Sequence, residues 1–214
     1  MRKLFVLLFI CANALSMGQA KLTVFRGGKV IGRITMTSKI TKDGAKVDEM
    51  SMSRTENGKS VDLRILSNFA ADGTPTRKFM AISLAGTTER HQIVATFKPE
   101  GVAVQVIPSL DPAQTIAPPA NAQLKQLDEF WFIRDHPKVG TLLSSFVFDL
   151  GSGKWSPRKV TYLGDADLVI GGKKVHAHRV SGGIGGQSIL QYLDDQGLPL
   201  RLEQGGLVFE RTNP

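Results

Sequence analysis

Two histidines separated by one residue are the clearest candidates for metal chemistry in this sequence. In "KKVHAHRV", His176 and His178 have the spacing that puts alternate residues of a strand on one face. Two imidazoles on one face can bind zinc or copper, but such a site needs a third ligand and usually a fourth. The other histidines, His91 and His136, have no second ligand nearby in the sequence. We therefore predict no metal site, and only weak binding if the pair takes an ion, and we interpret both residues as ordinary hairpin histidines.

The acidic and glycine-rich segments do not form a recognisable catalytic motif. Asp165, Asp167, Asp194 and Asp195 stand near predicted hairpin ends, where carboxylates usually cap backbone N–H groups. The segment "SGGIGGQS" lacks the lysine and the following helix of a phosphate-binding loop, and no Gly-x-Ser-x-Gly motif occurs. No nucleophile with a neighbouring base is visible. We predict no catalytic residues and no cofactor, and hence that the protein is not an enzyme.

The N-terminal segment has the three parts of a secretory signal peptide. Arg2 and Lys3 precede an uncharged apolar run, and Gly18 and Ala20 are small residues where a signal peptidase cleaves. The run is shorter than the ~20 residues of a membrane span. We predict that residues 1–20 are removed and that the protein is exported, to the periplasm or outside the cell. The single cysteine, Cys11, lies in that segment, so the mature chain has no disulfide, thiol nucleophile or cysteine ligand.

The charge pattern indicates which kinds of partner the protein can bind. Lysine and arginine number 27 and aspartate and glutamate 19; without Arg2 and Lys3 the balance is 25 − 19 = +6. The two signs are interspersed, which is typical of a solvated surface that favours anionic envelopes or lipids. We predict no nucleic-acid partner. The charge is compatible with binding to a membrane surface, but we predict no transmembrane span.

Alternation of apolar and polar residues predicts strands over most of the chain. Residues 22–107 alternate between turn signals such as Asp43-Gly44 and Asn57-Gly58, which predicts an antiparallel meander of six or seven strands. Strands are predicted again at residues 141–150, 155–163, 167–170 and 174–180, and in the closing segment. Between these regions, "PSLDPAQTIAPPAN" has four prolines and predicts a crossing loop, and helical spacing predicts a helix over residues 122–132. We expect one mainly β domain, residues 21–214, with two meanders (21–107 and 138–214) joined by a loop–helix segment (108–137).

Two stretches of the chain echo each other. "FAADGTPTR" and "YLDDQGLPLR" both run from an aromatic residue through an acid to Gly-x-Pro-x-Arg. Two interpretations remain open: two ordinary hairpins built from common turn residues, or a duplicated meander.

The ending "YLDDQGLPLRLE", after a signal peptide, a long meander and a helical insertion, resembles the bacterial periplasmic lipoprotein-carrier (LolA/LolB-like) superfamily. The resemblance implies a single highly curved antiparallel sheet, a half-barrel, with the helix and the Pro-rich loop on its concave side. Carriers of this type hold acyl chains there. The residues that carry the resemblance are Tyr192, Asp194, Gly197, Leu198, Pro199, Arg201 and Glu203.

The segment "DEFWFIRD" admits two interpretations. Its large apolar residues either pack the helix on the sheet as ordinary core, or line an apolar cavity together with methionines, which adapt to irregular guests. The second interpretation predicts an exported, non-catalytic protein that binds an apolar or acyl ligand between sheet and helix. The alternative is an envelope scaffold that binds another protein or an anionic surface without a small ligand. The predicted ligand-binding residues are Leu124, Leu127, Phe130, Trp131, Phe132, Met50, Met52, Met80 and Ile82.

Overall fold

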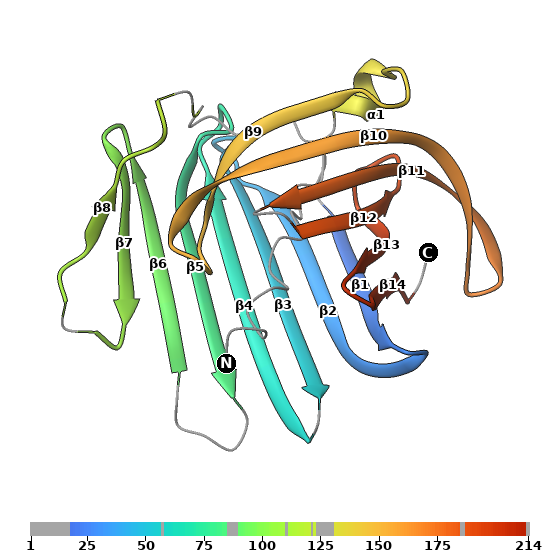
Figure 1. The fold of residues 1–214 in the computed structure, drawn as a ribbon, viewed down its shortest axis with the longest axis horizontal. Coiled ribbons are helices and arrows are strands. Elements are labelled where there is room, and N and C mark those ends of the chain that lie inside the picture. Colours follow the sequence, from blue (N-terminus) through green and yellow to red (C-terminus); the bar gives the residue numbers. More distant parts are fainter. Residues whose placement is uncertain are drawn as a thin grey trace.

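The structure is a computed structural model, and it describes residues 18–56, 58–84, 90–109, 111–120, 122, 131–184 and 187–212. These residues form a 14-stranded antiparallel sheet in the order β8-β7-β6-β5-β4-β3-β2-β1-β14-β13-β12-β11-β10-β9 (Figure 1). The first eight strands are β1 (Gly18–Arg26), β2 (Lys29–Ile40), β3 (Lys46–Glu56), β4 (Lys59–Phe69), β5 (Pro75–Leu84), β6 (Arg90–Lys98), β7 (Gly101–Ile107) and β8 (Gln114–Ile116). The helix α1 (Trp131–Asp135) follows, and then β9 (Leu142–Asp149), β10 (Lys154–Ile170), β11 (Lys173–Ile184), β12 (Gln187–Leu193), β13 (Pro199–Gln204) and β14 (Leu207–Arg211).

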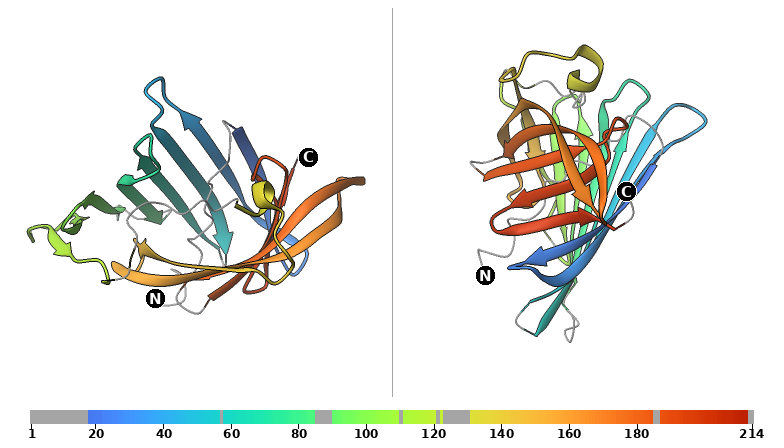
Figure 2. Two further views of the ribbon diagram at one scale, coloured as in Figure 1. Left: turned by 90° about the horizontal axis from the view of Figure 1, so that it is seen from above. Right: turned by 90° about the vertical axis from the view of Figure 1, so that its right-hand side faces the viewer.

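The sheet consists of two meanders joined edge to edge. Strands β1–β8 follow one another in space, as do β9–β14, and β1 pairs with β14 from Leu22↔Arg211 to Arg26↔Leu207. The sheet curves strongly, so that β9 and β10 pass across the concave side of the first meander (Figures 1 and 2). Its ends are β8 and β9, and these two strands do not pair with each other. The predicted class, a mainly β protein with one highly curved antiparallel sheet, is confirmed, as is the seven-strand meander over residues 22–107.

Strand register shows that one face of the sheet carries the core. Val24 lies opposite Phe209, Phe209 opposite Leu202, and Leu202 opposite Gln191, which lies opposite Val180. Residues directly opposite each other in a sheet share a face, so this apolar face is continuous across both meanders. The largest cluster on it joins β1–β7 with residues of the second meander; its buried members are Leu22, Val24, Ile34, Met36, Met50, Met52, Leu63, Met80, Ala95, Val102, Phe148, Leu150, Leu202, Leu207 and Phe209.

The helix is on the concave side, but its bounds differ from the prediction. Residues 123–130, the main part of the predicted helix, lie outside the described residues. Ala122 is not helical; its N–H donates to the carbonyl of Pro119 at 2.9 Å. The described helix runs three residues beyond Phe132 and stops before His136, which has φ of +43° and precedes Pro137. A residue before proline avoids helical geometry, which explains where the helix ends.

Two further predictions about local structure need correction. The Pro-rich segment is not only a loop, because Gln114–Ile116 forms the edge strand β8 against β7. Its four prolines lie outside that short strand, as an edge position requires. Residues 155–163 and 167–170 are not two strands. They belong to the single 17-residue strand β10, which continues through an irregularity between Tyr162 and Asp165.

The two echoing stretches form turns with the same backbone hydrogen bonds. Between β4 and β5, Ala70 N–H donates to Thr74 O at 2.8 Å and Gly73 N–H to Ala70 O at 2.9 Å. Between β12 and β13 the corresponding bonds, from Asp194 to Leu198 and from Gly197 to Asp194, are 3.0 and 2.9 Å. The β2–β3 turn has the same pattern from Thr41 to Ala45. Because a third turn outside the echo shares it, this geometry is a property of the turn type and does not by itself indicate duplication.

No helix within the described part of the chain has both the length and the apolar character needed to cross a membrane. Of the predicted signal peptide, residues 1–20, the first 17 lie outside that part. Residues Gly18–Ala20 belong to β1, where they pair with Met36–Ser38, and Ala20 is buried against Leu198.

Candidate functional site

A bulge in β10 gathers polar side chains on the concave face of the second meander. Tyr162 pairs with Val180, and the next partners are Asp165 and His178, so β10 uses one more residue than β11 over this interval. In a regular strand, residues three apart point to opposite faces. The extra residue turns Asp165 to the face of Tyr162, and the Tyr162 hydroxyl donates to Asp165 Oδ1 at 2.7 Å. Gly164, with φ of +87°, allows the bend, and Arg179 donates to the displaced Leu163 carbonyl at 3.0 Å.

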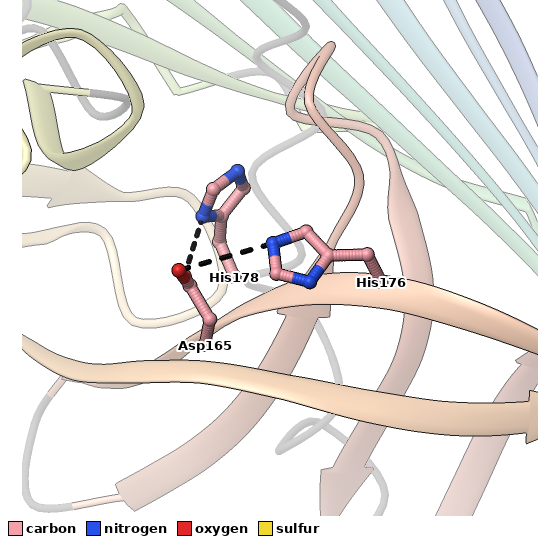
Figure 3. A group of neighbouring side chains, drawn as sticks. All are labelled: Asp165, His176 and His178. Atoms are coloured by element: carbon pink, nitrogen blue, oxygen red, sulfur yellow. Dashed lines mark hydrogen bonds and ion pairs between the residues drawn. The ribbon is translucent and has the colours of Figure 1, made fainter.

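Asp165 lies between the two histidines of β11 (Figure 3). Nδ1 of His178 is 2.8 Å from Asp165 Oδ1, and Nε2 of His176 is 3.8 Å from Asp165 Oδ2. The two imidazole rings meet edge to face, with centroids 5.4 Å apart. One ligand atom from each of these three residues lies within 4.8 Å of the others. We call Asp165, His176 and His178 the histidine–aspartate cluster.

A second carboxylate lies behind each histidine. Nε2 of His178 is 3.0 Å from Asp195 Oδ1, which comes from the β12–β13 turn. Nδ1 of His176 is 3.9 Å from Asp167 Oδ1, and the other oxygen of Asp167 is 2.9 Å from Lys174 Nζ. Both ring nitrogens of His178 therefore face carboxylate oxygens. Only a doubly protonated ring can donate to both; a neutral ring leaves one nitrogen as an acceptor facing another acceptor.

Burial and hydrogen bonding shift the titration of two groups in this region. Burial, helped by the bond to Asp165, raises the pKa of Tyr162 to about 12. The same hydroxyl, and then His178, stabilise the charged form of Asp165 and lower the pKa of its carboxyl. The His178 side chain is only 7% exposed, whereas those of Asp165 and His176 are about half exposed. The cluster thus has a buried end at His178 and an open end at His176.

The residues of this cluster were not predicted to act together, although the sequence contains a signal for it. Gly171 and Gly172 form a two-residue turn in which Ile170 pairs with Lys173. In such a hairpin the register follows from the turn, so Asp167 must face His176 and Asp165 must face His178, as observed. The third ligand is distant from the histidines in sequence and comes from the strand paired with theirs. Two imidazoles and a carboxylate are ligand types that a divalent transition metal accepts.

The predicted aromatic residues pack beside this cluster. Phe132 is buried; its ring stacks on Tyr162 at 5.7 Å and approaches His178 at 6.1 Å. Trp131 meets Phe132 edge to face at 6.2 Å. Their apolar neighbours are Val160, Val180 and Leu193. Leu124, Leu127 and Phe130 lie outside the described residues.

The methionines that were predicted to line a ligand site belong to a different apolar cluster. Met50, Met52 and Met80 are buried in the main core of β1–β7, and Ile82 packs against that core while partly exposed. The structure therefore places both predicted sets on the concave face, but in separate clusters: the methionines in the main core and the aromatic residues in a cluster on the second meander. It does not bring Trp131 and Phe132 together with the methionines.

A shallow groove that the sequence did not predict crosses the opposite face of the first meander. Its volume is about 450 Å³. Opposed residues on neighbouring strands form its floor, and five of its twelve lining residues are serine, threonine or alanine. Met52, Leu63 and Ile82 also line it, although they belong to the core on the other face. The lining residues are Arg33, Thr35, Ser51, Met52, Ser53, Asp62, Leu63, Arg64, Ala81, Ile82, Ser83 and Gln92.

Comparison with known proteins supports the fold. No family model matches this chain, and no curated protein matches it in sequence. A solved structure, a β-barrel-like protein of a domain of unknown function (DUF1849) from Brucella abortus, is similar with a TM-score of 0.67. The match covers 92% of this chain and 96% of that chain, at 10% sequence identity. At this identity the likeness shows a barrel-like β fold and nothing about activity.

Proposed function

We propose that this protein is an exported, non-catalytic binding protein of the lipoprotein-carrier-like type that holds an apolar or acyl ligand on its concave face. One observation carries the proposal: an apolar row on the first meander becomes more exposed from Met80 outwards to the edge of the sheet. The row is Ile65–Met80–Ile93–Val106, whose members lie directly opposite one another on β4, β5, β6 and β7.

Burial changes along this row. Met80 is 1% exposed, Ile65 and Ile93 are partly buried, and Val106 is 45% exposed. Neighbouring strands are about 4.8 Å apart, so a row across four strands is an apolar strip about 14 Å long. An unclosed sheet leaves this surface accessible at its β7–β8 end.

The row supplies the type of interaction that an acyl chain needs. Each methylene removed from water contributes about 0.8 kcal/mol, so a chain that buries several methylenes gains useful affinity without a polar contact. Phe132 is already packed on Tyr162 and Val180. The proposal therefore places the ligand on the exposed row of the first meander and not against the aromatic side chains of α1.

Native mass spectrometry of secreted protein, before and after organic extraction, tests the proposal with sodium palmitate and phosphatidylglycerol as probes. We expect an added lipid mass that extraction removes and that Val106→Asp weakens at least tenfold, because a charge would enter the apolar row. Val30→Asp is the matched control, since Val30 is also exposed (60%) but lies outside the row. A bare mass with both probes, or equal effects of the two variants, contradicts the proposal.

The interaction-scaffold alternative has its own supporting observation. The sheet ends at β8 and β9, and a sheet edge can accept a strand from another protein. If neither lipid binds and the secreted protein retains a protein partner that substitutions on the β9 edge release, the scaffold replaces the carrier as the proposed function.

A further inference from the structure

We infer that Asp165, His176 and His178 form a binding site for one divalent transition-metal ion, with Zn²⁺ as the ion that fits these ligands. The site lies on the second meander and does not depend on the apolar row, so this inference goes beyond the proposed function.

The first support is the direction of the ring nitrogens. His178 turns Nδ1, and His176 turns Nε2, towards the same carboxylate (Figure 3). These contacts are 2.8 and 3.8 Å. Two ligand atoms of a tetrahedral zinc site, each about 2.0–2.1 Å from the metal, are separated by about 3.3 Å. The two observed contacts, 2.8 and 3.8 Å, lie on either side of this value, so small side-chain rotations would bring the three groups to ligand distances.

The second support is the carboxylate behind each imidazole. A histidine that binds a metal almost always donates its other N–H to a carboxylate, a carbonyl or water, which fixes the ring. Here Asp195 is 3.0 Å from Nε2 of His178, and Asp167 is 3.9 Å from Nδ1 of His176. Both rings thus have one nitrogen turned inwards and the other turned to a carboxylate. We assign Asp195 and Asp167 as positioning residues.

The third support is charge. Asp165, Asp167 and Asp195 bring three carboxylates to two imidazoles, with Lys174 as the cation paired to Asp167. A divalent cation would balance this excess of negative charge. It would also bind a neutral His178 through Nδ1, leaving Nε2–H to donate to Asp195, so that neither nitrogen faces an unfavourable acceptor.

Ligand chemistry selects the ion. Imidazole nitrogen suits Zn²⁺ and its transition-metal neighbours, whereas Ca²⁺ and Mg²⁺ prefer sets made of oxygen atoms. Three protein ligands leave a position for water, and the half-exposed side chains of His176 and Asp165 leave room for it.

The test is titration of chelator-treated protein with ZnCl₂. Isothermal calorimetry and native mass spectrometry measure the binding. We expect one zinc ion per chain, no comparable uptake of Ca²⁺ or Mg²⁺, and a thermal midpoint that rises with zinc concentration because only the folded hairpin assembles the ligands. His176→Gln should abolish stoichiometric binding and still fold, since this side chain is about half exposed. Asp195→Asn should weaken binding 10- to 100-fold.

His91→Gln is the matched control, because His91 is exposed on β6, away from the cluster. It should bind zinc as the unaltered protein does. Imidazole nitrogen chemical shifts, read by NMR with and without zinc, should move for His176 and His178 alone. Absence of stoichiometric zinc, unchanged binding in His176→Gln, or an equal loss in His91→Gln would overturn the inference.

Discussion

The β4–β5 turn and the β12–β13 turn have the same backbone hydrogen bonds, but their acidic residues contact different parts of the molecule. In the first turn, Asp72 accepts hydrogen bonds from the N–H and the hydroxyl of Thr74, two residues further along the same turn. In the second turn, Asp194 stands where the first has Ala70. Its Oδ1 accepts from the N–H groups of Gln196 and Leu198, and its Oδ2 is 2.8 Å from Arg211 of β14.

The next residue of the second turn extends the difference. Asp195 reaches His178 on β11, whereas Ala71 at the corresponding position of the first turn has no ionisable group. The second turn is therefore tied to a strand on either side of its hairpin. Similar local sequence thus gives the same turn backbone, while the acidic side chains of the second turn join it to β11 and β14.

The largest difference between the turns should appear when these carboxylates are removed. Asp194→Ala deletes two hydrogen bonds to backbone N–H groups and leaves Arg211, which is only 12% exposed, without its carboxylate partner. We expect the free energy of unfolding to fall by about 2–4 kcal/mol. Asp72→Ala should cost less, about 1 kcal/mol, because the two bonds to Thr74 that it removes are exposed. Urea unfolding of both variants measures the gap, and equal losses would show that the ties to neighbouring strands contribute little.

A pH titration tests the site that the second turn joins. The pKa of Tyr162 is raised to about 12 in the folded state, against about 10 in an unfolded chain. Folding thus favours the protonated phenol, and this stabilisation is complete below about pH 10 and is lost as pH rises to about 12. It amounts to at most about 3 kcal/mol.

Tyr162→Phe should therefore show a smaller loss of unfolding free energy between pH 10 and 12 than the unaltered protein. The chain has two tyrosines, so phenolate absorbance in a Tyr192→Phe background reports Tyr162 alone. A Tyr162 midpoint near 10 would show that the phenol is neither buried nor bonded to Asp165 as described.

The smallest effect should be the one that the two turns share. Gly73 and Gly197 have φ of +83° and +76°, a region that costs a residue with a side chain about 1–2 kcal/mol. Gly73→Ala and Gly197→Ala should therefore lower the free energy of unfolding by similar amounts. Thermal denaturation of the two variants side by side checks this. A cost at Gly197 several times that at Gly73 would mean that the turns differ in backbone strain as well as in side-chain contacts.

Much of the fold could be predicted from the sequence because strands and turns are local patterns. Alternation such as Val61, Leu63 and Ile65 marks a strand with one buried face, and Asp-Gly and Asn-Gly pairs mark the turns between strands. The helix was predicted less well, because its spacing signal falls mostly on residues 123–130 and the described helix continues to Asp135. The break predicted inside β10 was wrong, because Gly164 introduces a bulge there and does not end the strand.

The candidate site was predictable only in part. The His-x-His spacing and the Gly171-Gly172 turn together determine that His178 pairs with Asp165 and His176 with Asp167. The contribution of Tyr162 depends on the bulge, and that of Asp195 depends on β12 lying beside β11. Neither is a property of a short segment.

The sequence alone determined the class of this protein: a mainly β chain of two meanders with tight glycine turns, because backbone preference and side-chain alternation act over a few residues. The tertiary structure decided which segments meet. The pairing of β1 with β14 joins the meanders into one sheet, and the curvature of that sheet brings Phe148 and Leu150 into the same core cluster as the methionines of the first meander. Contacts between residues far apart in the chain, among them those of Phe132 with Tyr162 and His178, depend on how burial is satisfied over the whole sheet, and no local pattern encodes them.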